Sequence, residues 1–233
     1  MPLFIAFICA IAVTGQTRES RVEIESDGWK LIADITIPNN DRLPVVLMLN
    51  KANGNREAYR GLAKRLADLG IASLRVDMRA HGESINKGRF GSPFDAKMQS
   101  LLVGSDRDVT AAIGFLKSLK NIDANRIGII GASYSGEEMV AAARRAGYVK
   151  AYAALSPGSF SDESINAIDN SRAAWIFFRS ADEPNLKGFF EDLRKSSTTA
   201  RTVEISGSKH ATDIFETLPE VQDLIAAWFK ERL

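Results

Sequence analysis

Continuous apolar runs alternate with apolar stripes at helical spacing along most of this 233-residue chain. The run "PVVLML" (44–49) has no hydrogen-bonding side chain, which is typical of a strand covered on both faces. Between Tyr59 and Leu69 the apolar residues instead recur every three or four positions, and the stripe stops at Gly70, a residue that commonly ends helices. Further strands are predicted at "IASLRVD", "RIGIIGA", "AYAAL", "AAWIFFR" and "RTVEI", and further helices at 109–116, 135–145, 185–195 and 221–228. This order predicts an α/β fold with a mostly parallel central sheet and helices on both faces.

The first two strands show a different pattern. "RVEIES" and "WKLIADITIP" alternate apolar and polar residues, which predicts an antiparallel amino-terminal hairpin with one face in water. Two later stretches, Gly82–Ser105 and Ser156–Arg172, follow strands and show no clear pattern. Ligands of open α/β sheets bind outside the carboxyl ends of the strands, so these stretches are candidates for the substrate mouth. No helical insertion is long enough to form a large cap, which favours a small or extended substrate.

The first sixteen residues form a separate segment. "PLFIAFICAIAV" (2–13) is uncharged and apolar, and the first charged residue is Arg18. The stretch is too short to span a membrane and fits the apolar region of a secretory signal, although the usual positive n-region is missing. The alternative is a first strand or helix of the core. We expect residues 1–16 to be a signal or targeting segment and 17–233 to be one domain, secreted or periplasmic if the signal is cleaved and cytoplasmic otherwise.

Charge and cysteine content narrow the range of partners. Lys and Arg number 30 against 29 Asp and Glu, so the net charge is +1, and there is no charged block that would indicate nucleic-acid binding. The only cysteine, Cys9, lies in the segment expected to be removed, which excludes an intramolecular disulfide. No cluster has metal-ligand spacing and no phosphate loop follows a strand, so no cofactor or metal is implied. We expect a small-molecule partner and no stable membrane association.

The most informative short stretch is "RIGIIGASYSGEE" (126–138). It places Ser133 after a predicted strand and before a predicted helix, with small residues at Gly131 and Ser135 on either side. This is the context of a nucleophile elbow, a tight turn that exposes one reactive hydroxyl. An ordinary strand-to-helix corner rich in Gly and Ser is the alternative.

A nucleophilic serine needs a base, and the chain has only two histidines. His210 lies in a turn after a late strand, and His81, the alternative base, lies in "RVDMRAHGES" after an earlier strand. A carboxylate should orient the base, and Asp182 directly follows an apolar strand; its neighbour Glu183 is the alternative. The chain order Ser133, Asp182, His210 matches the nucleophile–acid–base order of the α/β-hydrolases.

Five stretches in the correct order resemble the small dienelactone-hydrolase or serine-aminopeptidase-like α/β-hydrolases, which have little or no cap. They are the oxyanion strand, loop and first helix in "PVVLMLNKANGNREAYRGLAKRLADLGI", the strand end "RVDMRAHGES", the elbow "IDANRIGIIGASYSG", and the acid and histidine turns "SADEP" and "SGSKHA". The resemblance covers about residues 29–233.

The resemblance implies an α/β-hydrolase fold and an oxyanion hole formed by the backbone amides of Ala52 and Tyr134. It also implies a structural role for His81. Asn50 and Lys51 stand where the family usually has His-Gly. The predicted function is a serine hydrolase that cleaves a carboxylic ester or a related acyl bond through an acyl-enzyme. The alternatives are a peptidase or thioesterase of the same fold, or a protein that uses the fold only for binding.

Overall fold

A computed structural model describes residues 17–158, 160–183, 191 and 200–233. The apolar segment within residues 1–16, with Cys9, lies outside the described residues, as does nearly all of the helix predicted at 185–195.

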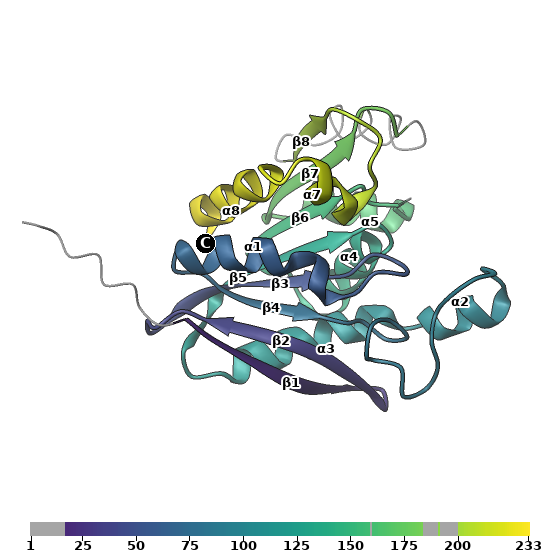
Figure 1. The fold of residues 1–233 in the computed structure, drawn as a ribbon, viewed down its shortest axis with the longest axis horizontal. Coiled ribbons are helices and arrows are strands. Elements are labelled where there is room, and N and C mark those ends of the chain that lie inside the picture. Colours follow the sequence, from purple (N-terminus) through teal and green to yellow (C-terminus); the bar gives the residue numbers. More distant parts are fainter. Residues whose placement is uncertain (1–16, 159, 184–190, 192–199) are drawn as a thin grey trace, which may run out of the picture.

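The described strands form one eight-stranded sheet in the order β1-β2-β4-β3-β5-β6-β7-β8 (Figure 1). Only β2 runs antiparallel to its neighbours, β1 and β4, while all other neighbouring strands are parallel. The mostly parallel sheet and the antiparallel amino-terminal hairpin are therefore confirmed. The strands are β1 (Arg18–Ser26), β2 (Trp29–Ile37), β3 (Leu43–Leu49), β4 (Ala72–Val76), β5 (Ile122–Ala132), β6 (Ala151–Leu155), β7 (Ala174–Ser180) and β8 (Ala200–Ile205).

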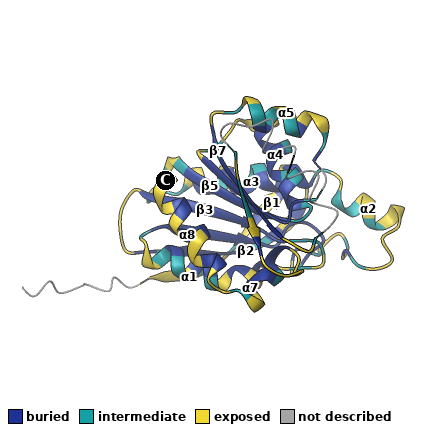
Figure 2. Cartoon of the chain, turned by 90° about the horizontal axis from the view of Figure 1, so that it is seen from above, coloured by how far each residue is buried: buried dark blue, intermediate teal, exposed yellow. Residues whose placement is uncertain are grey.

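Helices cover both faces of this sheet, as Figure 2 shows from above. Apolar residues of α3 (Ser105–Ser118) and α4 (Ser135–Ala146) pack on one face, and those of α1 (Arg60–Asp68) and α8 (Val221–Arg232) on the other. In β3, Val45 and Leu47 face the first pair of helices, whereas Val46 and Met48 face the second. All four side chains are completely buried, which explains why this strand is apolar on both faces.

Two helices lie in the stretches where the sequence has no clear pattern. The helix α2 (Ala96–Leu102) has no buried residue and projects away from the sheet (Figure 1). The helix α5 (Asp162–Asn170) begins at Ser161, whose hydroxyl accepts the Ser164 amide. Short turns of helix complete the described elements: η1 (Arg56–Tyr59), η2 (Ala211–Asp213) and α7 (Ile214–Thr217).

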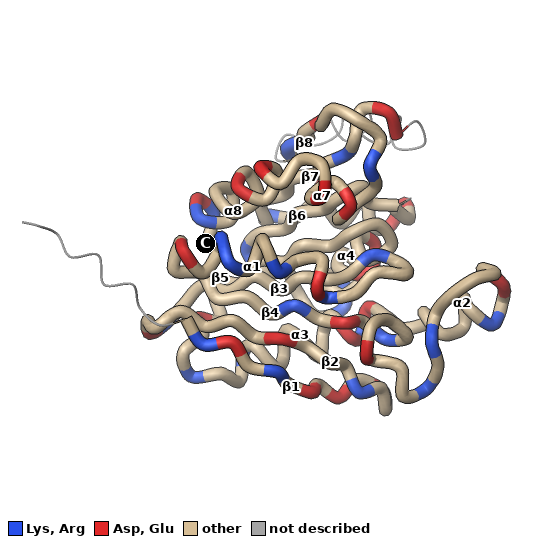
Figure 3. Tube along the Cα trace, viewed as in Figure 1, with Lys and Arg blue, Asp and Glu red and all other residues tan. Residues whose placement is uncertain are grey.

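Basic and acidic residues are interspersed along the trace (Figure 3), in keeping with the balanced composition. In the part of the chain that the structure describes, no helix has the length and apolar character needed to cross a membrane. The same residues contain no group of three or more His, Cys, Asp or Glu side chains arranged to hold a metal ion.

Candidate active site

Ser133 occupies the sharp turn between β5 and α4. Its φ is 56°, in the left-handed region that non-glycine residues rarely adopt. The Ser133 amide donates to the Leu155 carbonyl (3.0 Å), which holds the turn against the end of β6. The side chain is partly exposed, although both flanking elements are buried at this point. A serine in such a strained and accessible turn has the backbone geometry of a nucleophile elbow.

The residues around Ser133 explain why the turn can form. A Cβ on Gly131 would lie 2.7 Å from the Ser135 carbonyl oxygen, so only glycine allows the strand and helix to approach this closely. Ser135 is fully buried, and its hydroxyl accepts the Ala132 amide (2.7 Å) while lying 3.2 Å from the Leu49 carbonyl. The hydroxyl proton has two acceptors within reach, the Ala132 carbonyl (2.9 Å) within the elbow and the Leu49 carbonyl at the end of β3, so Ser135 lies between the two segments.

His210 and a carboxylate form a close pair after β8. The Nδ1 atom of His210 lies 2.6 Å from Oε1 of Glu183. Burial by itself would raise the pKa of Glu183, but hydrogen bonds from His210, Ser156 and the Ser180 amide outweigh burial and lower it. An ionised carboxylate only accepts hydrogen bonds, so Nδ1 of His210 carries the proton and Nε2 is left to accept one. This is the tautomer that a general base requires.

The carboxylate in this pair is not the one that the sequence favours. Asp182 is predicted to orient His210, but its side chain is exposed, and its amide donates to the Gly207 carbonyl (3.0 Å). Glu183, the alternative residue, takes the position instead. The reason is a turn at the end of β7, where the Glu183 amide donates to the Ser180 carbonyl (3.2 Å) and the Glu183 carboxylate returns to the Ser180 amide (2.8 Å). The pairing of Asp182 with His210 is thus corrected to Glu183.

The sequence does contain a signal for this turn. Ser180 and Glu183 are spaced as in S-x-x-E, the pattern in which a glutamate reaches back to a backbone amide three residues earlier. Here the glutamate half of the pattern forms, while the Ser180 hydroxyl donates to the Lys209 carbonyl (2.5 Å) next to His210. This spacing favours Glu183 as the inward carboxylate.

Ser133, Glu183 and His210 follow β5, β7 and β8, so all three lie at the carboxyl edge of the parallel strands. Among the described residues, however, no hydrogen bond joins Ser133 Oγ to His210. The His210 side chain is 45% exposed, so the ring has solvent beside it rather than packed side chains on every side. The structure brings His210 and Glu183 together and places Ser133 at the same edge of the sheet.

The predicted oxyanion amides belong to Tyr134 and Ala52. Neither amide donates a hydrogen bond to another group within the described part of the chain. The Tyr134 ring is buried against His81, which raises the pKa of its hydroxyl. Lys51, the unusual residue beside Ala52, forms an ion pair with Asp213, three residues after His210. The loop that contains Lys51 and Ala52 is therefore attached to the turn that follows His210.

His81 has no role at this pair. Only 2% of the residue is exposed, and its ring stacks between Phe90 and Tyr134, with centroids 5.2 and 5.4 Å away. Its Nδ1 lies 2.8 Å from the Arg79 carbonyl, and burial lowers its pKa. The structural role expected for His81 agrees with these contacts.

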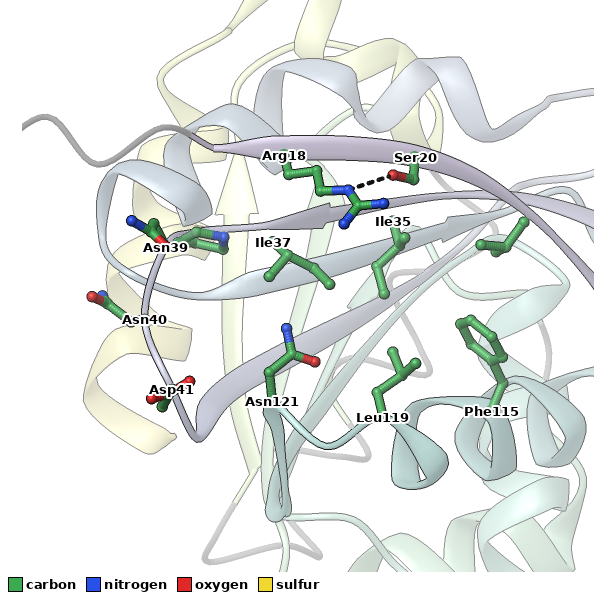
Figure 4. Close-up of a pocket in the computed structure, with 12 residues that line it drawn as sticks. Arg18, Ser20, Ile35, Ile37, Asn39, Asn40, Asp41, Phe115, Leu119 and Asn121 are labelled. Atoms are coloured by element: carbon green, nitrogen blue, oxygen red, sulfur yellow. Dashed lines mark hydrogen bonds between the residues drawn. The ribbon is translucent and has the colours of Figure 1, made fainter.

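A pocket of about 550 Å³ lies at the opposite end of the sheet (Figure 4). It is formed by β1, the end of β2, the loop before β3 and the end of α3. Arg18 at its rim donates to Ser20 (3.3 Å), and Asp41 is the one carboxylate among the described residues that line it. Because β2 runs antiparallel, its last residues lie at the amino ends of the parallel strands, away from Ser133. This pocket is separate from the candidate active site.

An eight-stranded, mostly parallel sheet with a strained serine after β5 and a histidine–carboxylate pair after later strands defines an α/β-hydrolase fold. Several solved structures share this fold. A dienelactone hydrolase from Anabaena variabilis has a TM-score of 0.72 at 19% identity over 94% of this chain and 99% of that one. A Pyrococcus furiosus esterase has a TM-score of 0.71 at 17% identity, covering 92% and 93% of the two chains.

The model of the dienelactone hydrolase family matches residues 31–213, and this chain belongs to that family of hydrolases. An uncharacterized protein of Pseudomonas aeruginosa is 31% identical over 108 residues. That match covers 45% of this chain and only 27% of the Pseudomonas protein.

Proposed function

We propose that this protein is a serine hydrolase that cleaves small carboxylic esters through an acyl-enzyme. Ser133 is the nucleophile, His210 the general base, and Glu183 the carboxylate that orients His210. The observation that carries the proposal is the 2.6 Å contact between His210 Nδ1 and Glu183, found at the same sheet edge as a serine with a φ of 56°. Membership of a hydrolase family supports it.

In the first half of the reaction, His210 Nε2 takes the proton of Ser133 as Oγ attacks the acyl carbonyl. The carbonyl oxygen becomes an oxyanion, which the amides of Tyr134 and Ala52 stabilise; one such donor contributes about 3–4 kcal/mol in a well-studied protease. The C–O bond to the leaving group then breaks, and the imidazolium returns its proton to the leaving alcohol. The negative charge of Glu183 stabilises the imidazolium that exists between these two transfers.

In the second half, water replaces the alcohol. His210 accepts a proton from water as the water oxygen attacks the acyl carbon, and the imidazolium then protonates Ser133 Oγ as the acyl–serine bond breaks. The products are the carboxylic acid and the regenerated enzyme.

Labelling by a fluorophosphonate probe tests the nucleophile. We expect covalent labelling of the native protein and none of Ser133→Ala, whereas Ser118→Ala, an exposed serine on α3, should label normally. Hydrolysis of p-nitrophenyl esters should follow the same order. Full esterase activity in Ser133→Ala would refute the mechanism.

Two adjacent substitutions test the acid. Glu183→Gln keeps the shape of the side chain but removes its charge, and we expect kcat/KM to fall about 100-fold or more. Asp182→Asn makes the same chemical change one residue away on an exposed side chain and should leave kcat/KM within about twofold. The opposite ranking would restore Asp182 as the orienting acid.

A protein that only binds its ligand is the second candidate. It is favoured by the missing hydrogen bond between Ser133 and His210 and by Lys51 in the oxyanion loop. Such a protein would neither react with the fluorophosphonate probe nor turn over any of a series of p-nitrophenyl esters and aminoacyl amides. An ester series of increasing chain length would also test the preference for small substrates.

A further inference from the structure

Ser156 is a buried residue that the mechanism above does not use. It directly follows β6, none of its surface is exposed, and its φ is 40°, in the left-handed region. Its amide donates to the Phe178 carbonyl (2.7 Å), which fixes the residue at the carboxyl end of the strand pair β6–β7. A non-glycine residue held in this region of φ is strained, so the surrounding structure must keep it there.

The Ser156 hydroxyl bridges the two residues that prepare the base. It donates to Oε2 of Glu183 (2.7 Å) and accepts the amide of Ala211 (3.0 Å), the residue after His210. The direction of both bonds is fixed, because an ionised carboxylate can only accept and an amide N–H can only donate. Both hydrogen-bonding functions of the hydroxyl are thus in use.

The bond to Glu183 also assigns its two oxygens to different partners. Oε2 receives the Ser156 hydroxyl and the Ser180 amide, which leaves Oε1 for His210 Nδ1. Without the hydroxyl, Oε2 would keep a single donor among the described residues, the Ser180 amide. The fully buried Ala211 amide would lose its acceptor at the same time.

The residues after Ser156 contact the nucleophile turn. The Gly158 amide donates to the Ser133 carbonyl (3.3 Å). Pro157 packs closely on Gly136, because a Cβ added to Gly136 would lie 3.0 Å from the Cβ of Pro157. One turn of three residues therefore touches the elbow, the acid and the histidine turn.

We infer that Ser156 is a positioning residue that sets the carboxylate of Glu183 and the backbone beside His210 in the geometry needed for proton transfer. This inference rests on the proposed function. Ser156 does not touch substrate, since its hydroxyl is buried and already bonded on both sides.

The test is Ser156→Ala, with Ser156→Gly as a second variant because glycine accepts a φ of 40° without strain. In both, we expect kcat for p-nitrophenyl acetate and the rate of fluorophosphonate labelling to fall about tenfold, with KM within about twofold. The acid limb of the pH dependence of kcat/KM should move to higher pH by about half a unit, because a carboxylate with one donor fewer holds the imidazolium more strongly. In Glu183→Gln the limb should move the opposite way.

Ser164→Ala is the matched control. Ser164 is also fully buried and donates to a glutamate, Glu137 (2.8 Å), but it does not contact Glu183 or the histidine turn. This variant should change thermal stability without changing kcat or the acid limb.

The outcomes separate the two proposals. If Ser133→Ala and Glu183→Gln lose activity while both Ser156 variants keep native kcat and an unmoved acid limb, the role of Ser156 is overturned and the proposed function stands. If Ser133→Ala keeps activity, the proposed function and the role of Ser156 are both overturned. Loss of kcat together with the shifted limb in either folded Ser156 variant supports the inference.

Discussion

Glu138, on α4 behind the elbow, lies among carboxylates and has no ion pair of its own among the described residues. Asp108 on α3 is bound by Arg79 (2.6 Å) and Asp106 by Arg145 (2.7 Å), so the nearby cations are already paired. Burial is the largest cause that raises the pKa of Glu138, and the negative charges of Asp106, Glu137 and Asp108 add to it. The pKa of Glu138 is about 7 as a result. The residue is therefore largely protonated in the folded protein at mildly acid pH.

This shift links the stability of the protein to pH. The ordinary pKa of a glutamate is 4.5, so between pH 4.5 and about 7 the folded state binds more protons than the unfolded state. The contribution of Glu138 to the free energy of unfolding therefore falls as pH rises through this window and levels off above it. One pKa unit corresponds to about 1.4 kcal/mol, so the ionised Glu138 destabilises the fold by at most about 3 kcal/mol at pH 8.

Glu138→Gln removes this penalty, because the amide has nearly the same shape and never ionises. Urea unfolding should show the variant within about 0.5 kcal/mol of the native protein at pH 4.5 and more stable by up to about 3 kcal/mol at pH 8. Glu163→Gln, on the exposed side of α5, should show no such pH-dependent gain. If Glu138→Gln unfolds with the same pH dependence as the native protein, the burial and charge environment inferred for Glu138 is wrong.

Three further experiments test the framework of the site. Gly131→Ala should lower the thermal midpoint and the rate of fluorophosphonate labelling together, because the new Cβ would meet the Ser135 carbonyl at 2.7 Å; an unchanged midpoint in a thermal scan would contradict this. A double-mutant cycle of Lys51→Met and Asp213→Asn should give a coupling of about 1 kcal/mol or less in urea unfolding, because the pair is partly exposed, at 21% and 36% of the side chains. Leu47→Ala should cost about 2–5 kcal/mol by the same measurement, since the side chain is completely buried in β3, and a smaller loss would mean that the core closes around the cavity.

The sequence predicts the sheet well because burial on both faces leaves a direct pattern. Strands such as β3 must be apolar at every position, and the helices between them need only one apolar stripe. In the amino-terminal hairpin, β1 alternates between exposed and buried residues, whereas β2 is mostly buried and includes the buried polar residues Asp34 and Thr36. These features depend on local spacing, and the confirmed fold follows from them.

The helix α5 could not be predicted in the same way. Its segment "DESINAIDN" is mostly polar, and only Ser164 and Ile168 are buried. It is held instead by hydroxyls at its amino end, since Ser161 and Ser164 both donate to the carboxylate of Glu137 on α4 (2.9 and 2.8 Å). Such contacts join residues more than twenty positions apart, and spacing within one segment does not reveal them.

The choice between Asp182 and Glu183 as the partner of His210 shows a limit of the sequence pattern. Asp182 and Glu183 both follow an apolar strand, and the order nucleophile, acid, base fits either residue. What separates them is the backbone: residue 182 still extends the β7–β8 pairing through its bond to Gly207, whereas residue 183 has entered a turn that directs its side chain back toward Ser180. The glutamate carboxylate, one methylene longer than that of aspartate, spans from this turn to both His210 and Ser156. A shift of one residue at a strand end therefore changes which of the two carboxylates contacts His210.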